Sequence, residues 1–273
     1  MPVNDELGIR MKSNYEDRAK TSLLRRTPIA IRLDGKSFHT FTRGMKRPFD
    51  ETLMLAMQRT TLRLCQNIQG CVLGYTQSDE ITLILCDYQR LDTSAWFDYQ
   101  VQKVCSIAAS MATLYFNQEF SGLVNDLCPF PEQTEESQRY NEVLRKAVRT
   151  GAMFDARCFN IPIEEVTNLI YWRQLDATRN SIQMVGQANF SHKDLQNKSC
   201  AAIQDMLFEQ FGINWNDFPT ACKRGACIVK KEFQNPDIDI KDGAYPISAW
   251  VIDTEIPIFK GDGREYIEKL IHF

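Results

Sequence analysis

The sequence lacks several patterns that would assign a function directly. It contains neither GxxxxGK[ST] nor GxGxxG, the glycine-rich loops of P-loop NTPases and of dinucleotide-binding domains. It has only three histidines, and no uninterrupted apolar run approaches the roughly 20 residues that a membrane helix needs. We therefore expect no multi-histidine metal site, no membrane span and neither of the two commonest nucleotide-binding loops.

The cysteines form no recognisable framework. All nine occur singly, and the closest pairs, Cys65 with Cys71 and Cys222 with Cys227, lack further Cys or His at zinc-ligand spacing. No apolar N-terminal segment resembles a signal peptide. We expect a cytoplasmic protein. The net charge of -3 does not mark a nucleic-acid binder, but a local basic patch can coexist with an acidic metal site.

At 273 residues the chain suits one large domain or a core domain with an appendage. Hydrophobic periodicity and turn residues predict an alternation of helices and strands. We expect an α/β sandwich of the α+β kind, an antiparallel or mixed sheet with helices packed on one face. The predicted elements are a helical lead-in within 1–27, strands at 29–33, 72–75, 81–85 and 154–159, helices at 50–68, 95–118, from Pro162 and from Ser191 to Phe211, and a β-rich tail at 226–231 and 249–253.

Two of these strands carry carboxylates at their ends. Asp34-Gly35 closes the strand at 29–33, and Ser78-Asp79-Glu80 lies in the turn of the following hairpin. Either turn alone is also typical of an ordinary loop. Carboxylates at the same edge of neighbouring strands repel each other, and Mg²⁺ ions that offset this repulsion can hold a triphosphate. The Gly35 carbonyl is a further candidate ligand, and together these residues indicate a metal-dependent nucleotidyltransferase.

A basic segment follows the first acidic strand end. We expect a loop at residues 36–39 whose backbone N–H groups are available to phosphate oxygens. His39 either contacts phosphate or packs beside the strand. For Arg43, Lys46 and Arg47 a solvated basic turn is the alternative, but beside the acidic pair we favour contact with a triphosphate.

Several blocks in order carry a resemblance to a known family. They read IAIRLDGKSFHTFTR, RPFDE, GYTQSDEITLIL, FDARCFNIP and YWRQLDATRNSI, and they span about residues 28–185. In this order the blocks closely resemble the tRNA-His guanylyltransferase family and its guanylyltransferase-like relatives. The resemblance implies a polymerase-palm-like catalytic domain at 1–185, used to extend a tRNA at its 5′ end in the 3′-5′ direction, with a C-terminal helix and β-rich extension at 186–273.

The resemblance also implies roles for individual residues. Asp34, the Gly35 carbonyl and Asp79 match the ligands of two Mg²⁺ ions, with Glu80 supporting them as a third catalytic residue. ATP or GTP would bind at the segments that match the family's nucleotide-binding residues, Asp34, Gly35, Lys36, Ser37, Phe38, His39, Ser78 and Asp79. Arg47 stands where the family has a lysine before Pro-Asn-Asp, and it retains the charge.

One departure from the family's pattern bears on the substrate. Thr178 stands where eukaryotic members have the histidine of a His-Ile-Asn-Asn-Leu-Tyr-Asn motif, and only Asn180 plainly matches that motif. In this departure the sequence resembles the bacterial, archaeal or phage-type branch of the family, whose members favour template-directed repair of 5′-truncated tRNAs. The family's usual assembly implies a homo-oligomer, a tetramer.

Further basic and polar residues are candidates for contact with tRNA. The candidates are Arg173, Arg179, Asn180, Lys223, Arg224, Lys230 and Lys231. The alternative for Arg173 is an internal ion pair, and the alternative for the lysines is a solvated face.

The leading hypothesis is a Mg²⁺-dependent 3′-5′ nucleotidyltransferase that acts on 5′-adenylylated or 5′-triphosphorylated tRNA. Two alternatives stay open. One is a palm-type nucleotide cyclase or conventional polymerase relative, and the other is a tRNA-binding protein without catalytic activity.

Overall fold

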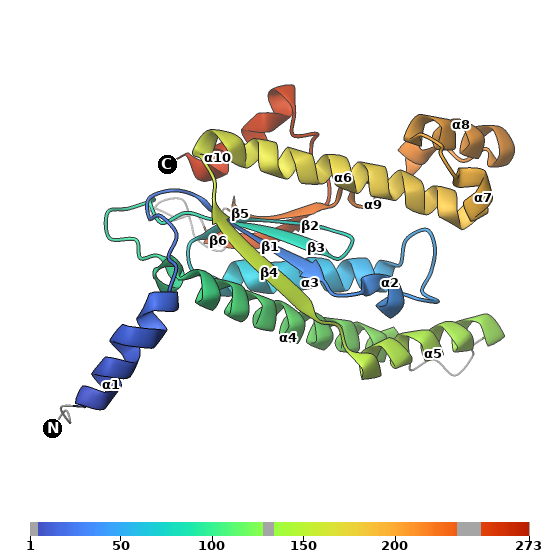
Figure 1. The fold of residues 1–273 in the computed structure, drawn as a ribbon. Helices are drawn as coiled ribbons and strands as arrows, with labels where there is room; N and C mark the ends of the chain where they lie inside the picture. The colour runs from blue at the N-terminus through green and yellow to red at the C-terminus, as the bar shows by residue number, and fades with distance from the viewer. Residues whose placement is uncertain (1–4, 128–133, 234–246, 273) are drawn as a thin grey trace, which may run out of the picture.

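A computed structural model describes residues 5–127, 134–233 and 247–272. Its centre is a six-stranded antiparallel sheet in the order β4-β1-β3-β2-β5-β6 (Figure 1). An antiparallel sheet with helices packed on it confirms the predicted fold class. The strands are β1 (Ile29–Gly35), β2 (Cys71–Gln77), β3 (Glu80–Leu85), β4 (Phe154–Asn160), β5 (Ala226–Phe233) and β6 (Ile247–Asp253).

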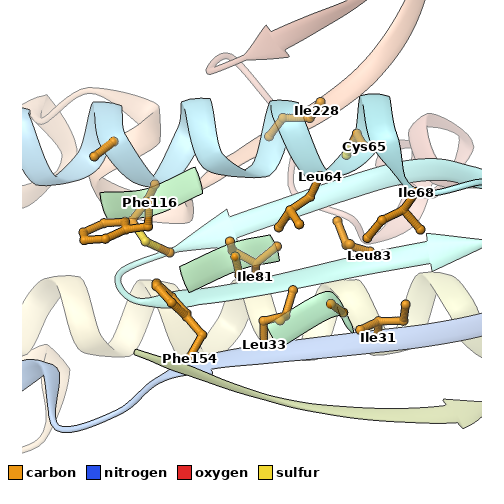
Figure 2. Close-up of a cluster of buried hydrophobic side chains, with 14 of the residues drawn as sticks. Ile31, Leu33, Leu64, Cys65, Ile68, Ile81, Leu83, Phe116, Phe154 and Ile228 are labelled. Atoms are coloured by element: carbon orange, nitrogen blue, oxygen red, sulfur yellow. The ribbon is translucent and has the colours of Figure 1, made fainter. Parts of the chain in front are cut away.

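One face of the sheet is covered by two long helices, α3 (Glu51–Asn67) and α4 (Val101–Leu127). Alternate residues of β1, including Ile31 and Leu33, meet Leu64 of α3 and Phe116 of α4 in the larger core (Figure 2). The Asp50 side chain caps α3 by accepting from Leu53 N at 3.1 Å. The helix α5 (Glu135–Thr150) packs against α4 and adds Leu144 and Ala147 to the same core.

Helices also cover the opposite face, where the sequence predicted none. There α6 (Ile163–Asn189) and α10 (Glu265–Ile271) bury a second cluster that includes Ala30, Ile84 and Ile170. The prediction of helices on one face was therefore wrong. Every residue of β2 and β3 is buried, and a strand that is apolar on both faces needs cover on both sides.

The C-terminal strands continue the same sheet, because β5 pairs with β2 and β6 pairs with β5. The helix predicted from Ser191 to Phe211 is in fact two. Ser191 and Asp194 form a capping box around α7 (His192–Leu195), and Ser199 caps α8 (Cys200–Phe211). Shorter elements complete the described chain: α9 (Thr220–Arg224), η3 (Trp96–Tyr99), η4 (Trp215–Asp217) and η6 (Gly261–Arg264).

The N-terminal segment is helical in short pieces, α1 (Glu6–Met11), η1 (Lys12–Glu16) and η2 (Asp17–Ala19), and it buries none of its residues. Figure 1 shows it projecting away from the sheet. The first four residues of the predicted lead-in lie outside the described part. No helix in the described ranges combines the length and the apolar character that crossing a bilayer would require.

The contact between α3 and β2 generates a test of the packing. A Cβ on Gly74 would lie 2.5 Å from Cys65 Sγ and 2.8 Å from Thr61 Cγ2. We expect Gly74→Ala to lower the free energy of unfolding by about 1–3 kcal/mol through overpacking, measured by urea denaturation. The control Gly122→Ala, at an open position of α4, should raise it by about 0.5–1 kcal/mol. Equal effects of the two changes would contradict the close approach.

Candidate active site

The two acidic strand ends meet at one edge of the sheet. Asp34 lies opposite Glu80 across the β1–β3 pair, and Gly35 N donates to Asp79 O at 3.1 Å. Asp155 of β4 lies opposite Asp34 on its other side. Burial, then the charges of Asp155 and Glu80, raise the pKa of Asp34. Burial also raises the pKa of Asp79, with added repulsion from Asp34 and Glu80.

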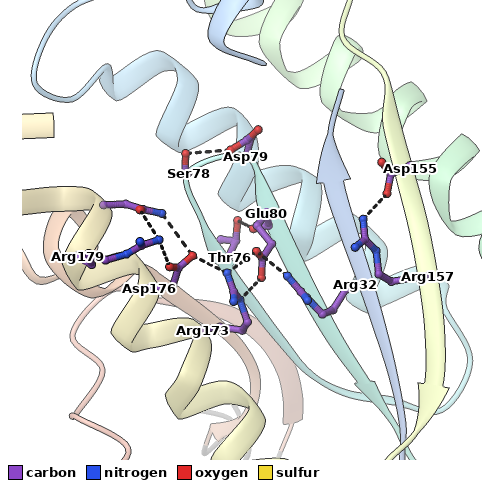
Figure 3. A network of polar contacts seen from close by, with 11 residues as sticks. Arg32, Thr76, Ser78, Asp79, Glu80, Asp155, Arg157, Arg173, Asp176 and Arg179 are labelled. Carbon is purple, nitrogen blue, oxygen red and sulfur yellow. Dashed lines mark hydrogen bonds and ion pairs between the residues drawn. The ribbon is translucent and has the colours of Figure 1, made fainter. Parts of the chain in front are cut away.

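Glu80 differs from the other two acids because guanidinium groups engage both of its oxygens. Arg173 of α6 donates through Nε to Oε1 at 2.6 Å and through Nη2 to Oε2 at 2.8 Å, and Arg32 of β1 donates to Oε2 at 3.0 Å (Figure 3). Glu80 is 7% and Arg173 5% exposed. Glu80 is thus placed to position the turn that carries Asp79 rather than to take a ligand itself.

The network continues along α6. Arg173 also donates to Asp176 Oδ2 at 2.7 Å, and Arg179 donates to Asp176 Oδ1 at 2.6 Å. Although burial acts in the opposite direction, the hydrogen bond from Arg179 and the charge of Arg173 lower the pKa of Asp176. The guanidinium carbons of Arg32 and Arg173 lie 5.2 and 4.3 Å from the ring centre of Trp172.

Beside this edge lies a cavity of about 620 Å³, which we call the nucleotide cavity after the role that the sequence predicts for several of its lining residues. It brings together predicted residues from three separate segments: Gly35, Ser37, Phe38 and His39 at the end of β1, Arg47 in the following loop, and Ser78 and Asp79 in the hairpin turn. Arg43 and Lys46 line it as well, as the triphosphate prediction expected. Asp34 and Lys36 are not part of its lining.

Local geometry explains the shape of this cavity. The helix α2 (Phe38–Phe41) turns the chain back directly after β1, and a Cβ on Gly35 would lie 2.2 Å from the ring of Phe38. Glycine is therefore required at position 35. Ser37 and Ser78 both adopt left-handed backbone conformations, at φ 57° and 50°. Such conformations cost energy for residues other than glycine and cluster at ligand sites.

Among the lining residues that were not predicted, two come from a distant helix. Met184 and Gln187, one helical turn apart on α6, close the cavity from the far side. Nothing in their local sequence separates them from ordinary residues of an amphipathic helix. Only the packing of α6 across the sheet brings them beside Asp79.

The donor set fits Mg²⁺. Within the described residues no group of three or more His, Cys, Asp and Glu side chains could hold a metal ion. Asp34 and Asp79 repel each other, however, and ionised oxygens in this state are stabilised by a cation. Mg²⁺ is commonly held by only one or two carboxylates together with water and substrate phosphates. The two aspartates and the Gly35 carbonyl are the residues that would hold it.

The candidates for RNA contact are placed in different ways. Arg173 is buried in the network described above, and Lys223 is buried with its Nζ donating to Asn216 O. These two side chains offer little surface to RNA. Lys230 and Lys231 are exposed, but they point to opposite faces of β5. Lys230 lies over the ring of Trp250, and Lys231 forms an ion pair with Asp253. The remaining candidates are Arg179, which is exposed, and Asn180 and Arg224, which are half-buried.

Comparisons with known proteins identify similar sequences and structures. Residues 9–162 match the family model described as tRNAHis guanylyltransferase. A bacterial tRNA(His) guanylyltransferase-like protein solved in complex with ATP is 38% identical, with a TM-score of 0.77 over 97% of this chain and 99% of that one. A structure of such a protein with GTP is also 38% identical, with a TM-score of 0.73 over 98% and 100%. A curated relative from Dictyostelium discoideum, named "Probable tRNA(His) guanylyltransferase", is 26% identical over 78% of each chain.

The buried ion pair predicts a large and specific loss of stability. We expect Arg173→Met to lower the free energy of unfolding by about 3 kcal/mol or more, because Glu80 would lose its bidentate partner while staying buried. The double variant Glu80→Gln/Arg173→Met should lose less free energy of unfolding than the two single variants lose together. The exposed neighbour gives the control, since Arg179→Ala should cost at most about 1 kcal/mol. Urea denaturation of the four variants measures this, and equal losses for Arg173→Met and Arg179→Ala would argue against the pair.

The raised pKa of Asp79 predicts a dependence of stability on pH. A carboxyl whose pKa is higher in the folded than in the unfolded state binds its proton more tightly when folded, so its ionisation lowers stability above that pKa. Without divalent cations, Asp79→Asn should therefore melt a few degrees above the wild type at pH 7.5, and the difference should shrink toward pH 4.

Thermal melting with EDTA measures this effect, with Asp92→Asn, an exposed loop carboxylate, as the control that should change little. Adding Mg²⁺ should raise the melting temperature of the wild type more than that of Asp79→Asn. A wild type that gains no stability from Mg²⁺, or an Asp79→Asn variant less stable at pH 7.5, would argue against a repulsive metal site.

Proposed function

The chain belongs to the tRNAHis guanylyltransferase family, and we propose that it is a Mg²⁺-dependent 3′-5′ nucleotidyltransferase that adds nucleotides to the 5′ end of tRNA. As a member of this family it is a nucleotidyltransferase. The relatives solved with ATP and with GTP support nucleoside triphosphates as its substrates.

The observation that carries the proposal is the composition of the nucleotide cavity. A single hollow combines Asp79 of the acidic edge with three cations, Arg43, Lys46 and Arg47. A triphosphate that carries Mg²⁺ needs this pairing, since carboxylates hold the metal while cations meet the remaining phosphate charge.

The proposed reaction of a 5′-monophosphorylated tRNA has two steps. The phosphate of a 5′-monophosphorylated tRNA first attacks ATP, which adenylylates the 5′ end and releases pyrophosphate. The 3′-hydroxyl of an incoming NTP then attacks the activated phosphate and AMP leaves. A 5′-triphosphorylated end reacts directly with release of pyrophosphate. Mg²⁺ held by Asp34, Asp79 and the Gly35 carbonyl would lower the pKa of the attacking hydroxyl and neutralise the triphosphate.

The protein's own groups orient the substrates for these steps. Arg43, Lys46 and Arg47 hold the triphosphate, and the backbone turn at Ser37 meets phosphate oxygens. Glu80 and Arg173 fix the hairpin turn, which holds the Asp79 carboxylate at the cavity wall. Met184 and Gln187 line the same cavity and would contact the base or the ribose.

We propose template-directed repair of truncated tRNAs as the main activity. Thr178, in the middle of α6, offers no imidazole where eukaryotic members carry a histidine, and this supports the broader substrate range. Mg²⁺ dependence, a cytoplasmic location and assembly as a homotetramer stay predictions of the resemblance.

One assay tests the reaction and its substrate together. The purified protein is given a 5′-monophosphorylated tRNA lacking its first nucleotide, with ATP and each NTP in turn. We expect incorporation only of the nucleotide complementary to the opposing 3′ strand. Asp79→Ala should reduce addition at least a thousandfold, the scale of loss for a removed catalytic group, while circular dichroism shows an unchanged fold.

Other outcomes would redirect the assignment. Addition of G regardless of pairing would favour the tRNA-His role, and a product formed from labelled NTP without RNA would indicate a cyclase. Retained activity in a folded Asp79→Ala protein would refute the site. Binding of tRNA with no turnover of any nucleotide would indicate a tRNA-binding protein without catalytic activity.

A further inference from the structure

A second hollow lies next to the nucleotide cavity, around the other side of α2. It encloses about 290 Å³ between α2, the C-terminal half of α5 and the segment 151–153 that leads into β4. We call it the α2–α5 hollow. Ser37 and Arg43 line both spaces, so the two spaces adjoin at the α2 turn.

The charge of this hollow is of one sign. Lys36, Arg43 and Lys146 line it, and across the described ranges none of the three takes part in an ion pair. Its described lining contains no Asp or Glu, whereas Asp50 and Asp79 line the nucleotide cavity. The α2–α5 hollow is therefore suited to phosphate that carries no metal ion.

Apolar groups form part of the remaining wall, together with the hydroxyl side chains of Ser37, Thr40 and Thr150. Phe41 is half-buried in the core, Ala147 and Ala152 are buried, and Met153 is 58% exposed. Cations beside an apolar surface match a nucleotide, which has a charged phosphate and an apolar base face. The volume is less than half that of the nucleotide cavity, which suits one nucleotide without a triphosphate.

The floor of the hollow is fixed before any ligand binds. The Asn117 side chain of α4 donates to Ala152 O at 2.9 Å and accepts from Ala152 N at 2.8 Å. Lys36 N donates to Met153 O at 2.8 Å. These bonds tie the segment to α4 and to the end of β1, so binding there would not require the segment to become ordered.

From these observations we propose that the α2–α5 hollow binds a phosphodiester-linked nucleotide of the RNA substrate, next to the 5′ end that reacts in the nucleotide cavity. The inference rests on the proposed function, because the occupant belongs to the RNA acted upon. It adds α5 to the RNA-binding surface and gives Lys146 the role of a phosphate contact.

The test separates RNA binding from turnover. The probe is a 5′-monophosphorylated tRNA transcript lacking its first nucleotide, and its affinity is measured by fluorescence anisotropy at several salt concentrations in EDTA. We expect Lys146→Gln to weaken binding several-fold and to reduce the slope of log K against log salt by about 0.7–1, the loss of one phosphate contact. Arg145→Gln, an exposed neighbour on α5 outside the hollow, should have a clearly smaller effect.

A second variant fills the hollow without removing charge. Thr150→Trp lies at the exposed last position of α5 and at the rim of the hollow. In turnover assays it should raise the KM for the truncated tRNA several-fold while leaving the KM for ATP and for the added NTP unchanged.

Three results would overturn the inference. Equal effects of Lys146→Gln and Arg145→Gln on RNA affinity would indicate diffuse surface charge. A raised KM for the NTP alone in Thr150→Trp would place a free nucleotide in the hollow. Unchanged RNA affinity in Lys146→Gln together with an unchanged KM for the tRNA in Thr150→Trp would show that the hollow does not bind RNA. Because affinity is measured without turnover, a protein that binds as expected but adds no nucleotide would refute the proposed function and not the hollow.

Discussion

The buried ion pair between Glu80 and Arg173 is the interaction on which the rest of the site depends. It joins β3 to α6 across 93 residues of sequence, and both side chains are nearly inaccessible to water. A buried carboxylate is tolerated only when paired. Arg173 and Arg32 offset the charge of Glu80, and the repulsion of Asp34 by Asp155 and of Asp79 by Asp34 remains at the sheet edge.

That remaining repulsion links stability to function. The raised pKa values of Asp34 and Asp79 mean that the ionised forms of these two carboxyl groups are less stable in the folded protein than in the unfolded chain. Sites of this kind trade stability for activity. The left-handed backbone at Ser37 and Ser78 adds to the cost at the same place, and the surrounding core of α3, α4 and the sheet supplies the stability that offsets it.

The turn at α2 organises the space around this edge. On one side it faces Asp79 and the cations of the nucleotide cavity, and on the other it faces Lys36 and Lys146 in a hollow without acids. If the two proposals hold, a metal-bound triphosphate and a metal-free RNA phosphate would meet different surroundings a few residues apart, because carboxylates line only the first of the two spaces.

The sequence by itself determined the strands, most helices and the acidic edge, because apolar runs, caps such as Asp50 and strand-end aspartates are local signals. The loop after β1 and the hairpin turn were predictable for the same reason. Which groups meet across the chain was decided by tertiary structure alone. Packing of α6 on the second face buried Arg173 and brought Met184 to the cavity, and no local pattern specifies which distant side chain will neutralise a given charge.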